Sequence, residues 1–378
     1  MNKDNLKIED NAETLSYEKL KEDYKFFYSP SYRVISDGKD PEESGYMVMS
    51  IAVENSVMKA GGCVISVLPI PGAKDREAAE QLFAPGSCVE IYAGYADALE
   101  AVFIGAVTSV QFIFAAADAP ELRVFCTDFS NMLMRNSINY IWGESGYDSF
   151  TKVADEIISK YIDGETLTDS AVEDVPIDEK PPFEQRDQSD YVFIREKADG
   201  NHIDFFVSGH NIYYQKRKPS ASPITALTWG VNIDSLAFTV KTAAPASDSE
   251  VKGWNIKDKE AFSAQAGIDG VKDRVCGDKI YDYAEKAYRG KPKIMAATSA
   301  QDEETAKLQA ENLLIARNKD ILSAAGECAG IPQILAGRVL AIEGVGDLLS
   351  GDYFIAATKH TINSNGYKTG FNLVEAHS

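Results

Sequence analysis

The sequence is poor in the residues from which metal and disulfide sites are built. Its 378 residues include five cysteines and four histidines. The cysteines are odd in number and lie far apart with no Cys-x-x-Cys pair, which implies neither a disulfide framework nor a zinc site. The histidines lack metal-ligand spacing among themselves and with the cysteines. We therefore expect no metal and no cofactor.

Long hydrophobic runs are also missing. No stretch approaches the roughly 18 apolar residues that cross a membrane. Residues 1–11 are polar and charged and contain no apolar segment of the kind that a secretory signal needs. We expect no membrane contact and synthesis in the cytoplasm.

Basic residues are the minority charge. There are 38 of them against 58 acidic residues, a net charge of −20. Such a chain repels a phosphate backbone, so a nucleic-acid binding site is not expected. The stretch from Tyr161 to Asp190 holds ten carboxylates against Lys180 and Arg186, which favours a solvated, mobile connector.

The first third of the chain carries the alternation of β-strands. Residues Tyr46–Glu54 alternate in period two, with Met47, Met49, Ile51 and Val53 expected on one face. Further strands are expected at Cys63–Leu68, Val89–Tyr92, Val102–Phe114 and Leu122–Cys126, separated by glycine, proline and aspartate turns. This spacing suggests a small antiparallel barrel or sandwich.

The middle third changes to a helical period. Residues Phe150–Tyr161 form one apolar stripe after Asp148 or Ser149 as the cap, and a second helix is expected near Ser189–Asp199 with Ser189 as its cap. A hairpin is expected at His202–Lys216, with its turn at Ser208–Asn211.

The last third returns to strands after one long helix. Further strands are expected at Thr225–Trp229, Ser235–Val240 and Glu250–Trp254, and Ser299–Asp302 resembles a capping box that opens the helix. The closing strands are expected at Ala336–Ile342, Tyr353–Thr361 and Tyr367–Val374.

These elements predict a mainly β fold with α+β insertions and two small antiparallel β-barrels per chain. The expected division is an N-terminal arm over residues 1–26 and a first barrel over residues 27–130. An α/β domain covers residues 131–201. The second barrel is discontinuous, over residues 202–255 and 333–378, and a helical or α+β insertion covers residues 256–332.

Catalytic motifs are not found. Gly143-Glu144-Ser145-Gly146-Tyr147 lacks the glycine that a nucleophile elbow needs two residues after its serine. Gly344-Val345-Gly346 lacks a third glycine and precedes a strand, so we interpret it as a turn. The acid pairs at Asp187 and Asp190, and at Asp302 to Glu304, stand at helix starts, where carboxylates stabilise the helix dipole. The sequence therefore predicts a protein that is not an enzyme.

A binding module is the competing class. A carbohydrate-binding β protein could stack sugars on Trp142, Trp229 and Trp254. The three lie in different elements, and Trp229 and Trp254 fall at strand ends where packing in a core or an interface is expected.

Several motifs follow one another in a recognisable order. The strand Val89–Tyr95 ends in Gly-Tyr and precedes a Phe-x-Gly-x-Val strand at Phe103–Val107. A Gln-Ser-Asp-Tyr-x-Phe helix start lies at Gln188–Phe193, and Val251–Trp254 reads Val-x-Gly-Trp. A glycine- and tyrosine-rich closing pattern covers Gly330–Thr369. Together these segments, from Tyr46 to Val374, resemble the phage late control protein D family, which includes the hub part of valine-glycine repeat proteins and the T-even phage hub. The motif residues are Gly86, Gly94, Phe103, Gly105, Ser189, Asp190, Tyr191, Trp254, Pro332, Gly337, Gly344, Gly346, Gly351, Tyr353, Gly366 and Tyr367.

The resemblance implies a structural baseplate hub of a phage-tail-like contractile injection machine. Its two barrels per chain imply a homotrimer that adapts the symmetry of a hexameric tail tube to that of a trimeric spike. The chain ends a few residues after the last hub strand, so the spike is expected to be a separate protein. Baseplate wedge proteins or LysM-type tube initiators are the other expected partners. The expected location is the cytoplasm during assembly and then the virion or a released particle.

Two further expectations follow from this interpretation. Valine at Gly344, Gly346 or Gly351 should impair folding or assembly through backbone strain wherever φ is positive. The net charge of −20 allows either a mainly acidic channel, which would keep acidic cargo from sticking, or acid on the outer surface for solubility.

Overall fold

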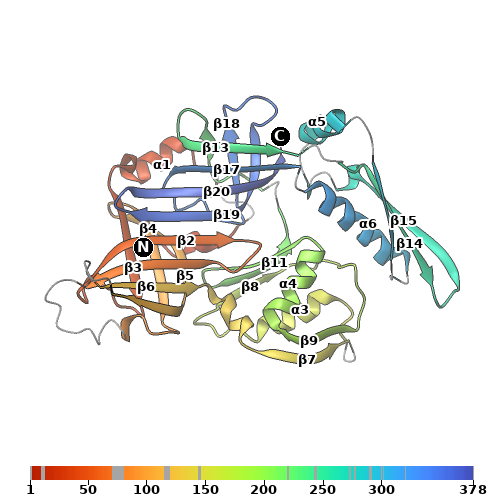
Figure 1. Ribbon diagram of the computed structural model, residues 1–378, viewed down its shortest axis with the longest axis horizontal. Helices are drawn as coiled ribbons and strands as arrows, with labels where there is room; N and C mark the ends of the chain where they lie inside the picture. The colour runs from red at the N-terminus through yellow and green to blue at the C-terminus, as the bar shows by residue number, and fades with distance from the viewer. Residues whose placement is uncertain are drawn as a thin grey trace.

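One large sheet organises the molecule (Figure 1). The computed structural model describes residues 2–9, 13–69, 81–114, 120–143, 146–218, 221–241, 245–271, 274–275, 278–288, 292–298, 300, 302–319 and 321–377. Its twelve-stranded sheet takes six strands from the first third of the chain and six from the second half. The first six are β1 (Pro30–Ser36), β2 (Tyr46–Ser56), β3 (Gly62–Pro69), β4 (Cys88–Tyr95), β5 (Ala98–Ile113) and β6 (Glu121–Thr127). The others are β12 (Ala226–Thr228), β13 (Ile233–Val240), β17 (Leu322–Ala329), β18 (Val339–Glu343), β19 (Gly351–Asn363) and β20 (Gly366–His377).

The first six strands form one β block and the other six form a second. The two β blocks are joined by hydrogen bonds between β2 and β19. These strands are antiparallel, in register from Ile51 opposite Ile362 to Ser56 opposite Ala357. The strand order is β1-β4-β5-β6-β3-β2-β19-β20-β17-β13, with β18 on β19 and β12 on β18. The structure therefore differs from the two barrels that we expected, since no sheet of the described residues closes on itself. Each block instead satisfies one edge of the other, because an unpaired edge leaves backbone N–H and C=O groups without partners.

A β-bulge in β2 changes which residues face inward. The pairing of β2 with β3 shifts between Val48 and Ser50. Ile51 and Val53 are buried as expected, but Met47 and Met49 are 46% and 45% exposed. The expectation of all four on one face is therefore wrong, because an extra residue reverses the alternation beyond it.

The middle of the chain folds as an α/β unit. Strand β7 (Ser137–Trp142) pairs with β9 (Phe183–Ser189), and helices α3 (Phe150–Ser159) and α4 (Asp190–Gly200) pack with them (Figure 1). The acidic stretch expected to be a mobile connector belongs to this unit. It contributes β8 (Asp169–Val172) and β9, and its apolar residues Leu167, Val175, Ile177 and Phe183 are buried. The carboxylates stand at the sequence positions between these apolar residues, so an acidic segment can still bury its apolar side chains.

The expected hairpin is present but pairs elsewhere. Strands β10 (Ile203–Ser208) and β11 (Asn211–Lys216) form it, with Gly209 and His210 at the turn. We expected these strands in the second barrel, whereas β11 pairs in parallel with β8 of the α/β unit. Long-range pairing of this kind leaves no local signal in the sequence.

The insertion before the closing strands is a separate small sheet. Strand β14 (Asp248–Asn255) lies between β15 (Glu260–Gly267) and β16 (Lys293–Ala297), and helix α6 (Glu303–Asn318) packs on it through Ala306 and Ala310 (Figure 1). Helix α5 (Asp278–Tyr288) lies beside them. The cap of α6 is Asp302, whose Oδ1 accepts from Thr305 N at 3.0 Å. The expected capping residue Ser299 lies outside the described residues.

The N-terminal arm lies in the centre of the fold. Residues Asp4–Leu6 form a short 3-10 helix, and the Leu6 side chain is 2% exposed. Asn5 Nδ2 donates to Ala101 O at 2.9 Å and to Pro332 O at 3.0 Å, so one side chain connects the two β blocks. Ser208 Oγ donates to Leu6 O at 2.7 Å, which adds the α/β unit. Helix α1 (Tyr17–Asp23) then packs on the large sheet.

Arg338 holds this arm in place. Its guanidinium donates to Asn5 O at 2.6 Å, to Lys7 O at 3.0 Å and to Gln333 O at 2.9 Å. Backbone carbonyls that are buried need such donors. None of the described helices is both long and apolar enough to cross a membrane.

We expect Arg338→Met to lower the free energy of unfolding by about 3 kcal/mol, because three carbonyls lose their donor. The matched control is Arg123→Met, which removes a half-exposed arginine paired with Glu121 on β6 and should change stability by less than about 0.5 kcal/mol. Urea unfolding followed by circular dichroism measures both. Equal stability of the two variants would contradict the central position of the arm.

Candidate functional site

The solvent-facing side of the large sheet is continuous across both β blocks. One row of neighbours crosses seven strands from β13 to β6, and each residue in it is at least partly exposed. The row is Ser235, Glu327, Gly370, Lys359, Glu54, Gly62 and Thr127. The next row from β19 to β5 is Thr361, Ala52, Val64, Phe125 and Ser109. Small and polar side chains predominate in these two rows, and Met47 and Met49 are exposed further along β2.

Most charged side chains on this face form ion pairs, whereas Glu327 has none among the described residues. Lys359 Nζ lies 3.0 Å from Glu54 Oε1, and Lys368 Nζ lies 2.6 Å from Asp234 Oδ2. Arg123 Nε lies 2.7 Å from Glu121 Oε1. The Lys359 ion pair holds the pKa of Glu54 below its usual value through a hydrogen bond. The face therefore carries little net charge although the chain is strongly acidic.

A shallow hollow of about 330 Å³ lies where β17, β20, β19 and β2 meet on this face. Gly326 and Gly370 line it, and a Cβ on Gly370 would meet no atom closer than 3.7 Å. A Cβ on Gly326 would lie 2.6 Å from the Phe371 ring, so the close approach of that ring requires glycine.

Behind this face, aromatic rings of the two blocks meet. Tyr95, at the end of β4, and Tyr367, near the start of β20, have ring centroids 5.9 Å apart. Tyr24 of the segment after α1 joins them at 6.0 Å from Tyr95, and its hydroxyl accepts a hydrogen bond from Gln333. A Cβ on Gly330 would lie 2.1 Å from the Tyr367 ring. The tyrosines of the two Gly-Tyr motifs, Gly94-Tyr95 and Gly366-Tyr367, thus hold the two β blocks together in the interior.

His360 closes this interior network. It is fully buried, with Nε2 3.0 Å from Ile334 O and Nδ1 2.8 Å from Tyr367 Oη. The neutral ring satisfies both partners if Nε2–H donates to the carbonyl and Nδ1 accepts from the tyrosine hydroxyl. Burial lowers the pKa of His360 to about 4. The ring is a structural crosslink, with no access to a substrate.

The helix-start motif also faces inward. Ser189 Oγ accepts from Val192 N and caps α4 as expected. Asp190 is buried and accepts from Tyr161 Oη at 2.7 Å and from Gln185 Nε2 at 2.9 Å. Tyr191 packs on Phe205 with centroids 5.6 Å apart. These residues join α3, β9 and α4 and form no open site.

The other motif residues are spread over the fold and do not converge. Phe103 and Gly105 lie in β5, Trp254 in β14, Tyr353 in β19, and Pro332 in the loop before β18. A Cβ on Gly94 in β4 would lie 1.9 Å from Ala98 O. Gly344 and Gly346 have φ of +78° and +85°, whereas Gly351 is the first residue of β19 and does not share their left-handed backbone. The strain expected for valine at Gly351 therefore lacks its cause. Gly86, Gly337 and Gly366 also have positive φ.

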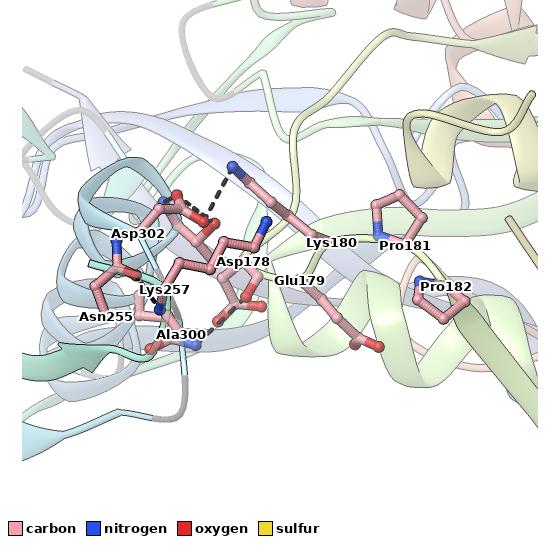
Figure 2. Close-up of a pocket in the computed structure, with 11 residues that line it drawn as sticks. Asp178, Glu179, Lys180, Pro181, Pro182, Asn255, Lys257, Ala300 and Asp302 are labelled. Carbon is pink, nitrogen blue, oxygen red and sulfur yellow. Dashed lines mark hydrogen bonds and ion pairs between the residues drawn. The ribbon is translucent and has the colours of Figure 1, made fainter. Parts of the chain in front are cut away.

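A cleft of about 660 Å³ separates the α/β unit from the insertion (Figure 2). Lys180 Nζ reaches across it to Asp302 Oδ2 at 3.0 Å, and Gln309 Nε2 donates to Asp178 O at 3.3 Å. Burial raises the pKa of Asp178. Asp302 is already the cap of α6. The polar groups are thus engaged in joining two units, and no nucleophile–base pair lies among the lining residues.

The other candidates for chemistry remain apart. Glu144 and Ser145 lie outside the described residues. No group of three or more His, Cys, Asp or Glu side chains in the described part of the chain could hold a metal ion. Trp142 is buried, whereas Trp229 and Trp254 are 48% and 55% exposed. Trp229 follows β12 of the large sheet, and Trp254 lies in β14 of the insertion sheet. A shared sugar-stacking surface is not formed by them.

Sequence reasoning missed Arg338 and Asn5 as the residues that hold the arm. Arg338 stands beside a motif glycine, but two of its three carbonyl partners lie more than 300 positions away in sequence. Its long-range contacts leave no signal in the sequence that could have singled it out.

Comparison with known proteins places the fold. Residues 29–364 match the sequence model of the family described as the Alg8 N-terminal domain. No curated protein matches the chain.

Solved structures with a similar fold include tail proteins. The tail protein from Neisseria meningitidis MC58 superposes with a TM-score of 0.65 at 12% identity, over 92% of this chain and 97% of that one. The 43 kDa tail protein of prophage MuSo2 from Shewanella oneidensis gives 0.63 at 12% identity, over 92% and 98%. An E. coli component of the type VI secretion system, described as structurally similar to the bacteriophage T4 tail proteins gp27 and gp5, gives 0.55 at 11% identity, over 92% and 77%. At these identities the likeness shows a shared fold.

We expect His360→Gln to flatten the pH dependence of stability. The folded-state pKa of about 4 lies below the value of about 6.5 in the unfolded chain. The neutral ring therefore stabilises the fold above pH 6.5, and this contribution of about 3 kcal/mol is lost as the pH falls towards 4. Urea unfolding at pH 7.0, 5.5 and 4.5 measures it.

The variant should be less stable at pH 7.0 by about 1–3 kcal/mol, because glutamine cannot reach both partners. Asp128 acts with the opposite sign, since burial raises its pKa to about 6, but it is present in both proteins and cancels in their difference. A variant with the wild-type pH dependence would show that His360 is not a buried neutral ring.

Proposed function

We propose that this chain, which belongs to the family described as the Alg8 N-terminal domain, is the structural baseplate hub of a phage-tail-like contractile particle. The observation that carries the proposal is the continuous sheet, whose one hydrated face spans both β blocks. The tail-protein fold supports the same role. On this proposal the protein acts by assembly and not by catalysis, as a member of the phage late control protein D group.

The proposed assembly is a homotrimer. Each chain supplies two β blocks, so three chains present six blocks to a hexameric tail tube and keep threefold symmetry towards a separate trimeric spike. Wedge proteins or LysM-type tube initiators are the further partners that we propose. The particle would assemble in the cytoplasm and leave it as a virion or released machine.

The two ends of the sheet supply the contacts that a ring needs. Strands β1 and β13 end the strand order, so each has a free edge among the described strands. Phe26 and Tyr28, just before β1, are 61% and 86% exposed. Trp229 and Val231, just before β13, are 48% and 73% exposed. A head-to-tail contact between these two ends would bury apolar surface and pair the edges, and three such contacts close a ring.

The hydrated face is proposed to line the channel of this ring. Its small side chains leave the passage smooth, and its paired charges give little net field. Cargo of either charge would then not be strongly attracted to the channel wall. This arrangement puts most of the acidic excess on the outer surface, the second of the two alternatives that net charge allowed.

We expect the purified chain to run as a trimer, at three times its 41.3 kDa mass, in light scattering behind size exclusion. Val231→Asp should lower the observed mass towards one chain, because an unpaired carboxylate would be buried at each contact. Met295→Asp is the matched control, since Met295 is 64% exposed on the insertion sheet, and it should leave the mass unchanged. A wild-type chain that stays monomeric, also within an assembled baseplate, would refute the hub.

A further inference from the structure

A small pocket lies where all three parts of the fold meet. Its volume is about 320 Å³, at the lower end of the roughly 300–1,000 Å³ typical of ligand pockets. The loop after β2, helix α4, the hairpin β10–β11 and the ends of α6 and β20 contribute to it. It is distinct from the cleft of Figure 2 and from the hollow on the sheet face.

Cations predominate in this pocket although the chain is acidic. Four basic side chains line it against the two carboxylates Asp199 and Asp204. The basic side chains are Arg195, Arg217, Arg274 and Lys319. With a chain net charge of −20, a concave region with two excess positive charges stands out as a place for an anion.

Two of the arginines are fixed before any ligand arrives. Arg195 donates to Val57 O at 3.2 Å and to Asp199 Oδ1 at 3.2 Å, and its guanidinium carbon lies 5.4 Å from the centre of the Phe205 ring. Arg217 binds Asp204 through Nε and Nη2 and lies 4.9 Å from the centre of the Phe354 ring. Both carboxylates of the pocket are thus engaged by arginine.

Lys319 remains available. Among the described residues no carboxylate pairs with its ammonium group, which stands just after the end of α6. His202, which also lines the pocket, shows the effect of the positive charges around it. Its pKa is lowered to about 4, mainly by burial and further by the charges of Lys319, Arg274 and Arg217.

The remaining wall is apolar, and this restricts the kind of anion. Aliphatic side chains and Met58, which is 56% exposed, complete the lining. They are Val57, Ile203, Ile315 and Val374. A bare inorganic anion makes no favourable contact with an apolar wall. The C-terminus of a chain with an aliphatic last residue instead presents a carboxylate and an apolar side chain together.

We propose that this pocket binds the C-terminal carboxylate of a partner protein whose last residue is aliphatic. The carboxylate meets Lys319, and the aliphatic side chain packs against Met58 and Val374, because Val57, Ile203 and Ile315 are themselves buried. This contact goes beyond the hub role, because it neither requires the trimer nor follows from it.

The test uses the intact chain and three probes in isothermal titration calorimetry. N-acetyl-leucine should bind with a Kd of about 1 mM, a modest affinity suited to a ligand of this size. N-acetyl-leucinamide, the same molecule without the charge, should bind at least about tenfold more weakly. Inorganic phosphate should also bind at least about tenfold more weakly, because it leaves the apolar wall unfilled.

Lys319→Met should weaken N-acetyl-leucine by about tenfold or more. Lys307→Met, which removes the same charge from an exposed position of α6 outside the pocket, should leave the Kd unchanged. Equal binding of the amide, tighter binding of phosphate, or no binding at about 10 mM probe would each overturn the proposal. The mass of the chain by light scattering is independent of these outcomes, so a failure here is distinguishable from failure of the hub.

Discussion

The pairing of β2 with β19 is the constraint on which the rest of the structure depends. Its six residue pairs turn two β blocks from opposite ends of the chain into one sheet. That sheet has one hydrated face and one buried face, and the buried core draws on both blocks. The arm, held by Asn5 and Arg338, closes the joint from behind. Without this pairing there would be no continuous face for the proposed channel.

A few of the residues that carry the family resemblance make the joint, and others stabilise single units. Tyr95 and Tyr367 meet across it, His360 crosslinks Tyr367 to the backbone, and Asp190 ties together the helices and strands of the α/β unit. Such residues are buried and satisfied by one another, so their contribution is to the stability of the fold.

The sequence predicted the elements well and their long-range partners poorly. Alternation and turn signals located the hairpin at 203–216, the helix at Phe150 and the cap Ser189, because these depend on neighbours within a few residues. They could not reveal that β2 pairs with β19 some 300 positions later, nor that a bulge at Val48 turns Met47 and Met49 outward. The prediction of a mobile connector for the acidic stretch was wrong for a related reason. Its few apolar residues are buried by strands elsewhere in the chain. The basic pocket was invisible, because its four cations come from four separate segments of the chain.

Electron cryo-microscopy of an assembled particle that contains this chain tests the central claim most directly. The account predicts a ring of three chains at the end of the tube, with Ser235, Lys359 and Glu54 facing the central channel and β1 of each chain beside β13 of the next. A ring in which this face of the sheet points outward, or a particle in which the two β blocks are not joined through β2 and β19, would contradict it.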